Sequence, residues 1–593
     1  MSYAAPLRDM RFVLNELVGL DRVAALPGCE HVGAELADAI LAEGEKFAAE
    51  VLAPLNVPGD RQGARLENGV VHMPDGFRDA YEKFVAGGWN ALAGAAEFGG
   101  QGLPAAIATP VEEMWNAANL SFALCPLLTR GAIEALTLCG TAEQKARYLP
   151  RMVAGTWTGT MNLTEPQAGS DLAAVRARAV PDGPFHRIHG QKIFITYGEH
   201  DLAENIVHMV LARLPDAPDG VKGISLFVVP KFLVHADGTL GARNDVRCVS
   251  IEKKLGIHAS PTAIMAYGDS EGALGELIGE PNRGLEYMFI MMNAARFAVG
   301  LQGVAIAERA YQQALAYART RVQGTELGTR GGARVAIIRH PDVRRMLMDM
   351  KARTEAMRAL AYVTAAALDA GRLHADPAER ARHQQRAELL TPIVKGWCTE
   401  TAIELASVGI QVHGGMGFIE ETGAAQHLRD ARILAIYEGT TGIQANDLVG
   451  RKLFRDHGAA ARAMIAEMRD CVAALAGENF SGMRAALGDA VAALEASVAW
   501  ILATHAERPR ATAASAVPLL KMFGIVAGGW QMARAALAAQ ARLEAGEENF
   551  MRAKIITARF YADHVLPQAR ALAHTVQHGS AATLALETEE FDA

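Results

Sequence analysis

A single carboxylate, Glu438, lies between apolar residues and a short turn in the stretch AIYEGTTGIQAND, residues 435–447. Ile436 and Tyr437 supply apolar bulk on one side, and Gly439 permits an unusual backbone conformation on the other. A carboxylate that loses its water in such surroundings has a raised pKa, which suits a general base that works near neutral pH. Taken alone, the stretch favours a loop glutamate whose carboxylate stays in water.

The stretch MNLTEPQAGSDLAAV, residues 161–175, gathers hydroxyls and open backbone in a loop that contains proline and glycine. Thr164, Gly169, Ser170 and Asp171 are the kind of groups that hydrogen-bond a flat polar heterocycle or a phosphate. The alternative is that Ser170 or Asp171 only caps a short turn.

Two further stretches have groups that a ring-shaped ligand needs. In KIFITYGEH, residues 192–200, Phe194 and Thr196 would lie on one face of a strand, where they could stack on a ring and hydrogen-bond it, or Phe194 could simply be core. In VGIQVHGGMGFIEE, residues 408–421, the glycines permit close backbone approach or merely end a helix. A single histidine such as His413 more often has a structural role, with its ring nitrogens hydrogen-bonded, than a catalytic one.

These stretches lie on a chain whose periodicity changes twice. Apolar residues recur at helical spacing before residue 160, with a helix in residues 32–56 that should stop at Pro58-Gly59 and a loop at residues 95–104. Strand-like segments follow at 187–196, 205–214 and 223–234, and helical spacing returns at residue 285. We expect a mainly α protein with a central β-domain, divided into domains at residues 1–159, 160–284, 285–453 and 454–593.

Three local features complete this expected architecture. Thr440 should cap a helix that starts at TGIQANDL. A glycine-rich, flexible insertion is expected at GTELGTRGGAR, residues 324–334, and a frayed end at LETEEFDA, residues 586–593. Beyond Phe454 the chain is rich in alanine and its charges are balanced, which favours a packing domain.

Composition narrows the class of partner. The 593 residues have a formal net charge of −8 without a basic block, which argues against nucleic acid or an anionic membrane and favours a small molecule. The six cysteines are far apart and read as reduced thiols of a cytoplasmic protein, and no metal is implied. No export signal or membrane span is visible, and no glycine-rich phosphate loop lies between a strand and a helix.

In their order along residues 40–450, the motifs resemble those of the acyl-CoA dehydrogenase family. The matching stretches are EFGGQGLP, GTAEQKARYLPRMVAGTW, LTEPQAGSD, KIFIT, the helix with Arg296, GGMGF, RDARILAIYEGT and GIQ. The resemblance implies a helical N-terminal domain, a β-barrel-like middle domain and a helical bundle around FAD, usually in a homodimer or a dimer of dimers. The added C-terminal helical domain is typical of the long subfamily of about six hundred residues.

The resemblance also implies which residues bind. FAD would be lined by residues of this chain, with residues 411–415 approaching from a neighbouring subunit and Arg321 meeting the FAD phosphates. The acyl-CoA would be held by Ser170, Arg296 and Tyr437. The residues implied for FAD are Met161, Leu163, Thr164, Gly169, Ser170, Phe194, Thr196, Arg321, Gln411, His413, Gly414, Gly415 and Thr440.

The implied reaction is the α,β-dehydrogenation of an acyl-CoA thioester to a trans-2-enoyl-CoA. Glu438 would remove the α-proton while hydride passes to FAD, and a backbone N–H at the glutamate would help polarise the thioester carbonyl. Some family members have the base immediately before the arginine that matches Arg296, but here that position is Ala295, which cannot abstract a proton. Electron-transferring flavoprotein would be the electron acceptor.

The sequence departs from the family pattern at two places. The usual Arg-x-x-Phe-Gly is Arg321-Val322-Gln323-Gly324, and the glutamine expected two residues after Thr440 is Gly442. Members of the long subfamily act on 3-methylmercaptopropionyl-CoA or on straight-chain fatty acyl-CoAs. Two other classes of protein have the same motifs. One is an acyl-CoA oxidase that uses oxygen, and the other is a non-catalytic DNA-binding relative, which would need a basic C-terminal domain.

Overall fold

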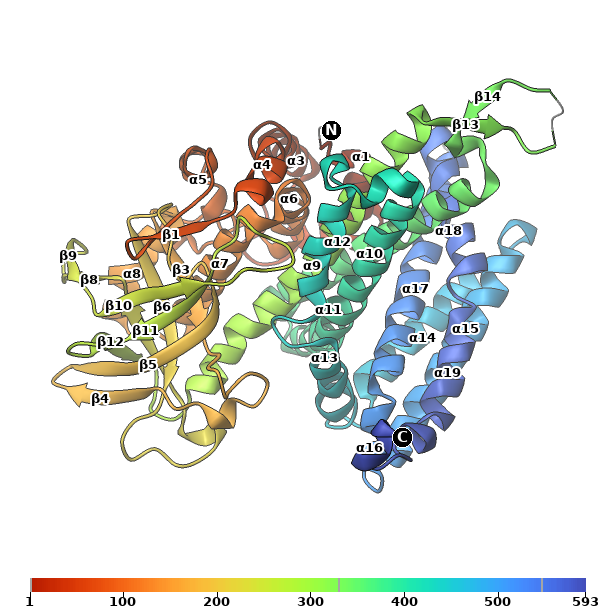
Figure 1. Ribbon diagram of the computed structural model, residues 1–593. Coiled ribbons are helices and arrows are strands. Elements are labelled where there is room, and N and C mark those ends of the chain that lie inside the picture. Colours follow the sequence, from red (N-terminus) through yellow and green to blue (C-terminus); the bar gives the residue numbers. More distant parts are fainter. Residues whose placement is uncertain (1–2, 329–330, 545–547) are drawn as a thin grey trace.

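A computed structural model describes residues 3–328, 331–544 and 548–593 (Figure 1). Helices come first, a central sheet follows, and two further groups of helices complete the chain. This order confirms the predicted mainly α fold with a β-domain in its middle. The sheet begins at Trp157, the second group of helices at Gly284 and the last group at Ala459.

The N-terminal helices surround an aromatic core that includes Phe84, Trp115 and Phe122. The helix expected to stop at Pro58-Gly59 instead continues to Gln62, because Gly59 packs directly against the ring of Phe77 and tertiary contact outweighs the cost of the proline. The helices of this region are α1 (Leu7–Phe12), α2 (Leu20–Ala24), α3 (Ala34–Phe47), α4 (Ala53–Gln62), α5 (Phe77–Ala86), α6 (Ala105–Ala118), α7 (Leu120–Cys139) and α8 (Ala142–Ala154), with π-helical segments η1 (Val13–Val18) and η2 (Ala48–Leu52) and the hairpin of β1 (Arg65–Glu67) and β2 (Val70–His72).

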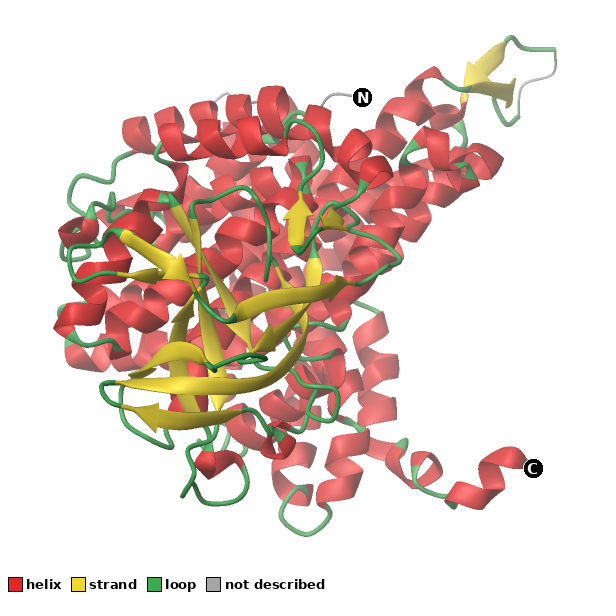
Figure 2. Ribbon diagram, turned by 60° about the vertical axis from the view of Figure 1, so that its left-hand side comes forward, coloured by secondary structure: helices red, strands yellow, loops and turns green. Residues whose placement is uncertain are grey.

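The middle region is one curled sheet, seen against the helices in Figure 2. Its strand order is β10-β11-β5-β12-β7-β6-β3, and β4 also pairs with β5, so the long β5 is shared by three neighbours. The three predicted strand segments are confirmed. The strands are β3 (Trp157–Asn162), β4 (Arg178–Asp182), β5 (Phe185–Thr196), β6 (Asn205–Ala212), β7 (Ser225–Pro230), β10 (Val246–Ile251), β11 (Thr262–Tyr267) and β12 (Ala273–Ile278), beside the small pair β8 (Phe232–Val234) and β9 (Leu240–Arg243).

Three long helices form the second helical region: α9 (Gly284–Thr320), α10 (Pro341–Leu373) and α11 (Pro377–His413). The glycine-rich insertion between α9 and α10 is a hairpin of β13 (Val322–Thr325) and β14 (Arg334–Ala336) that projects from the bundle in Figure 1, and residues 329–330 lie outside the described part. Shorter elements then return along α11 to its far end: η8 (Gly414–Phe418), η9 (Glu420–Thr422), α12 (Ala424–Arg432), η10 (Ile433–Ala435), α13 (Thr441–Asp447) and η11 (Leu448–Leu453).

The C-terminal helices pack on this bundle through α17, which contacts both α10 and α11. The expected frayed end contains a short 3₁₀ turn, η13 (Thr588–Asp592), because Glu587 and Glu590 cap each other, and its residues are exposed. The helices are α14 (Ala459–Ala474), α15 (Ser481–Thr504), α16 (Pro509–Ala514), α17 (Ala516–Glu544), α18 (Glu548–His564), α19 (Gln568–His578) and α20 (Ser580–Thr583).

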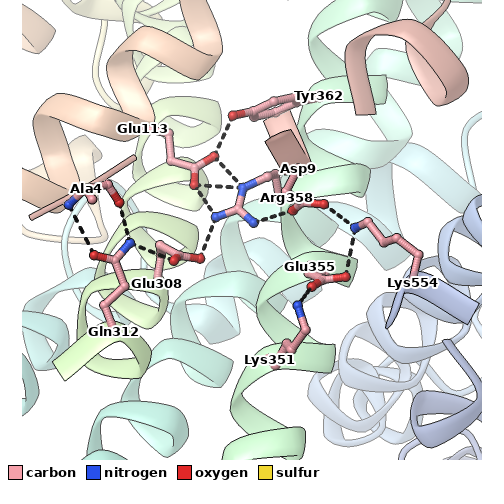
Figure 3. A network of polar contacts seen from close by, with 10 residues as sticks. All are labelled: Ala4, Asp9, Glu113, Glu308, Gln312, Lys351, Glu355, Arg358, Tyr362 and Lys554. Atoms are coloured by element: carbon pink, nitrogen blue, oxygen red, sulfur yellow. Dashed lines mark hydrogen bonds and ion pairs between the residues drawn. The ribbon is translucent and has the colours of Figure 1, made fainter. Parts of the chain in front are cut away.

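A buried ionic network joins the two ends of the chain (Figure 3). Arg358 of α10 donates to Asp9 of α1 at 2.6 Å, to Glu113 of α6 at 2.6 Å and to Glu308 of α9 at 2.8 Å. Lys554 of α18 completes it with an ion pair to Asp9. The first and last helical regions are therefore both fastened to the central bundle.

Within the described part of the chain, three helices are long and apolar enough to span a membrane by length and composition alone. They are α7, α9 and the segment Glu478–Thr504. Within the protein, 72% of the most apolar window of each of the first two is buried, against 39% for the third. Most apolar residues of α7 and α9 are thus buried against other parts of the protein.

Candidate active site

Glu438 lies in the turn between η10 and α13, and its backbone is left-handed with φ = 55°. Gly439 follows with φ = 89°, so two consecutive residues adopt a conformation that side chains disfavour. Thr440 caps α13 as predicted, since its hydroxyl accepts a hydrogen bond from the Ile443 N–H at 3.3 Å. Among the described residues, the Glu438 N–H donates to no backbone carbonyl and remains free to meet a ligand.

The surroundings of Glu438 set its acidity. The side chain is half-buried, and burial raises the pKa of its carboxyl above the usual range, while the positive charges of Lys395 and Arg296 lower it in part. Lys395 also donates a hydrogen bond to the Gly439 carbonyl at 2.7 Å. A raised carboxyl pKa between two cations is compatible with a base that accepts one proton and releases it again.

Arg296 and Tyr437, two of the three residues predicted to hold the acyl-CoA, adjoin Glu438. Arg296 is only 3% exposed, lies 3.4 Å from the Asp447 carboxylate, and its Nε has no partner among the described residues. The Tyr437 hydroxyl donates to the Gln302 side chain of α9. The fold therefore places groups of α9, α11 and the Glu438 turn around one point.

The loop after β3 is held in place by a buried ion pair. Glu165 accepts from Lys192 at 2.7 Å and from the N–H groups of Arg176 and Ala177, and the same ammonium donates to the Leu163 carbonyl. The residues predicted to bind the flavin differ in exposure along this loop. Met161 is buried, Leu163 and Thr164 are half-buried, and Gly169 and Ser170 are exposed. Asp171 caps a short turn by accepting from the Ala173 N–H at 3.0 Å, as the alternative interpretation expected.

Phe194 is not a core residue. Its φ is 59° and its side chain is 58% exposed, while the neighbouring Ile195 is buried. The pairing of β5 with β11 shifts register between Ala263 and Met265, which interrupts the strand alternation opposite this point. An exposed ring beside the half-buried Thr196 can stack on a flat ligand.

A second group of predicted residues gathers where α9 and α11 end. His413 is buried against Tyr317, with ring centroids 4.5 Å apart, and donates from Nδ1 to the Gly409 carbonyl at 2.7 Å. Its Nε2 has no partner among the described residues. Gln411, Gly414, Gly415 and Arg321 are exposed, and both glycines have open space where a side chain would stand.

The two groups lie far apart in one chain. Arg296 belongs to the first and Arg321 follows the last residue of the same helix, so the rise of an α-helix separates them by about 36 Å. The first group offers an exposed aromatic ring and several hydroxyls, which fit a flavin ring. The second offers a cation, open glycine backbone and an orphaned imidazole nitrogen, which fit a dinucleotide phosphate or base.

Sequence reasoning missed four buried polar side chains of the site: Gln302, Lys395, Gln444 and Asp447. Gln444 donates from its amide to the carbonyls of Glu438 and Gly439, both at 3.2 Å. A polar residue within an apolar helical segment could have identified such side chains in the sequence, as in TPIVKGW around Lys395.

A small cavity of about 20 Å³ lies among α6, α7 and α9. Trp115, Leu127 and Ala298 line it, and the paired side chains of Glu112 and Arg130 add a polar wall. Ala298 is one helical turn from Gln302, which contacts Tyr437, but none of Arg296, Lys395 and Glu438 lines this cavity.

Three domain profiles match the chain. Residues 35–156 match the acyl-CoA dehydrogenase N-terminal domain, residues 282–453 the acyl-CoA dehydrogenase C-terminal domain, and residues 464–587 a domain described as acetyl-CoA dehydrogenase C-terminal like. The third match includes most of the helices that follow the bundle.

Whole-length relatives resemble the chain in both sequence and fold. It is 53% identical to the 3-methylmercaptopropionyl-CoA dehydrogenase of Ruegeria pomeroyi, over 96% of this chain and 97% of that protein. It is 35% identical to a butyryl-CoA dehydrogenase of Syntrophomonas wolfei, over 95% of each. A solved acyl-CoA dehydrogenase of Bacillus anthracis, complexed with FAD, superposes with a TM-score of 0.74 at 20% identity, over 97% of this chain and 92% of that one.

Proposed function

Because the chain belongs to the acyl-CoA dehydrogenase family, we propose that it oxidises the Cα–Cβ bond of 3-methylmercaptopropionyl-CoA with FAD as its cofactor. The protein is an oxidoreductase of CH–CH groups, as its family is. The identity of 53% with the Ruegeria pomeroyi enzyme, which extends over the C-terminal helices, carries the choice of substrate.

A short straight-chain acyl-CoA is the second candidate. The resemblance to a butyryl-CoA dehydrogenase supports it. Both candidates are thioesters with a compact acyl chain. They differ mainly in whether a sulfur atom replaces the γ-carbon of the acyl chain.

In the proposed reaction Glu438 takes the proton from the α-carbon. FAD, when bound, would supply the acceptor for the hydride of the β-carbon, and the electron pair left on the α-carbon would form the double bond of a trans-2-enoyl-CoA. The thioester carbonyl accepts a hydrogen bond from the free Glu438 N–H, which stabilises the negative charge that develops on its oxygen. The buried cations at Lys395 and Arg296 keep the carboxylate ionised until it accepts the proton.

The remaining predicted roles divide between the two groups of residues. Phe194, Thr196, Thr440 and the loop of Ser170 would hold the flavin ring near Glu438. Arg321 and residues 411–415 of a second copy would hold the distant part of FAD, because about 36 Å separates the groups within one chain. A homodimer, or a dimer of dimers, therefore follows from this proposal.

Electrons would leave the reduced flavin through an electron-transferring flavoprotein in the cytoplasm, without a role for nucleic acid or membrane. An acyl-CoA oxidase would instead pass them to oxygen, and a DNA-binding relative would bind duplex in a salt-sensitive way. The balanced charge of the C-terminal helices supports the enzyme over the DNA-binding alternative.

One set of anaerobic experiments tests the proposal. Wild-type protein loaded with FAD is mixed with a panel from butyryl-CoA to palmitoyl-CoA and with 3-methylmercaptopropionyl-CoA, and bleaching of the flavin absorbance is recorded. We expect the fastest bleaching with 3-methylmercaptopropionyl-CoA, and slow reoxidation when air is admitted.

The matched variant is Glu438→Gln, which keeps the size and polarity of the side chain. It should retain FAD and lose bleaching by more than a thousandfold, about 4 kcal/mol of transition-state stabilisation. Bleaching at the wild-type rate would remove Glu438 as the base, prompt peroxide formation would favour the oxidase, and fastest bleaching by palmitoyl-CoA would rule out the short-chain assignment.

A further inference from the structure

Lys395 is a buried lysine in the middle of α11 that no predicted role used. Its side chain is fully shielded from solvent, and among the described residues it makes no ion pair within 4 Å. Its ammonium donates one hydrogen bond, at 2.7 Å, to the carbonyl of Gly439. An ammonium without a direct carboxylate partner is costly to bury, so its position calls for a function.

The bond from Lys395 holds a strained turn. Glu438 and Gly439 both have left-handed backbones, which costs a non-glycine residue about 1 kcal/mol. Gln444 binds the carbonyls of both residues, and Lys395 binds the second from the opposite element. Two side chains from α11 and α13 thus fix the peptide from which the Glu438 carboxylate and its free N–H project.

The other charges around Glu438 are already paired. Arg296 of α9 lies beside Asp447 of α13, which also binds Arg451 of η11 at 2.5 Å. Glu400 of α11 accepts from the Thr441 hydroxyl. Lys395 is therefore the neighbouring cation that lowers the pKa of Glu438 without being paired to a carboxylate.

We propose that Lys395 is the positioning residue of the Glu438 turn: its bond to the Gly439 carbonyl fixes the turn, and its charge keeps the Glu438 carboxylate ionised at neutral pH. This inference rests on the proposed role of Glu438 as base. Lys395 transfers no proton, because the α-proton moves from the substrate carbon to the Glu438 carboxylate alone.

The sign of the pH effect follows from the charge. Burial raises the pKa of Glu438, and Lys395 lowers it in part. Removing the positive charge raises this pKa further, so a higher pH is needed to ionise the base. Burial also lowers the pKa of Lys395 to about 8, so its charge is retained at neutral pH.

The test uses an acyl-CoA analogue with sulfur in place of the β-carbon. Such an analogue can lose its α-proton but has no β-hydrogen to transfer, so proton removal is observed without turnover. The readout is the long-wavelength absorbance that appears when the deprotonated analogue lies against bound FAD. It is recorded across mildly acidic to mildly basic pH for FAD-loaded wild type, Lys395→Met, Lys395→Gln and Lys395→Arg.

We expect the midpoint of this absorbance to rise by about one pH unit in both neutral variants, a tenfold loss of proton removal on the acid side. Lys395→Arg, which keeps the charge, should retain the wild-type midpoint. Gln444→Met removes bonds to the same turn without removing a charge, so it separates turn geometry from charge: a midpoint shift as large as that of Lys395→Met would overturn the role of the charge.

Unshifted midpoints in both neutral variants would overturn the proposal, as would a shift in Lys395→Arg as large as in Lys395→Met. The arginine variant decides the question if the neutral ones fail to bind FAD. Glu438→Gln separates this inference from the proposed function: if it still forms the absorbance, the role of Glu438 fails whatever Lys395 does. If only Glu438→Gln loses it, the base stands and Lys395 is merely structural.

Discussion

At the residue scale, the site depends on buried charges that are held by specific partners. Lys192 and Glu165 show this beneath the flavin-side loop, where the ammonium is fully buried and 2.7 Å from the carboxylate. Burial lowers the pKa of Lys192 to about 8, against the opposing effect of Glu165. The glutamate belongs to LTEPQAGSD, so the motif supplies its own anchor.

Lys192→Met should detach this loop. The substitution leaves the Glu165 carboxylate buried without its cation, which we expect to cost about 3–5 kcal/mol of stability. Flavin content after purification and the thermal unfolding midpoint should both fall. Lys222→Met, at an exposed lysine of the same sheet region, is the control and should change neither; equal flavin content in both variants would contradict the anchor.

At the scale of elements, close helix packing explains why the chain is rich in alanine and glycine. Helix α17 meets α11 where Gly524 lies against the buried Trp397. A methyl group on Gly524 would stand 2.2 Å from the Trp397 ring, a distance that only movement of a helix can relieve. The contact fastens the C-terminal helices to the helix that contains Lys395.

Gly524→Ala should therefore loosen the C-terminal helices. Overpacking of this kind costs about 1–3 kcal/mol or more, measured as a lower thermal unfolding midpoint and faster proteolysis after residue 454. The control is Gly482→Ala in α15, where an added methyl group meets nothing within 4 Å. That change should be neutral or should stabilise by about 0.5–1 kcal/mol, and a similar loss in both variants would refute the packing argument.

At the scale of the whole molecule, the network around Arg358 connects helices from both ends of the sequence (Figure 3). Burial alone would raise the pKa of Asp9, but Lys554 and Arg358 outweigh it and hold this pKa well below its usual range. A depressed carboxyl pKa contributes stability above the unfolded value of about 4 and loses it as pH falls. The network should therefore weaken in acid.

Asp9→Asn tests this contribution. At neutral pH we expect a loss of about 3–5 kcal/mol, because two buried cations lose a shared carboxylate. Below about pH 4 the difference from wild type should shrink, since the carboxylate of the unfolded chain then binds a proton that the folded state does not, which favours unfolding of the wild type. Asp38→Asn removes an exposed partner of Arg11 and should cost less than about 1 kcal/mol; a loss for Asp9→Asn that does not vary with pH would contradict the assignment.

The sequence by itself determined the order of helical and strand regions, the cap at Thr440 and the family, because periodicity, capping and ordered motifs are local properties. Only the tertiary structure decided that Arg296, Lys395 and Glu438 meet, that Phe194 is exposed, and that α4 continues through Pro58. Each of these depends on contacts between residues distant along the chain. A lone lysine in an apolar helix signals such a contact, but not its partner.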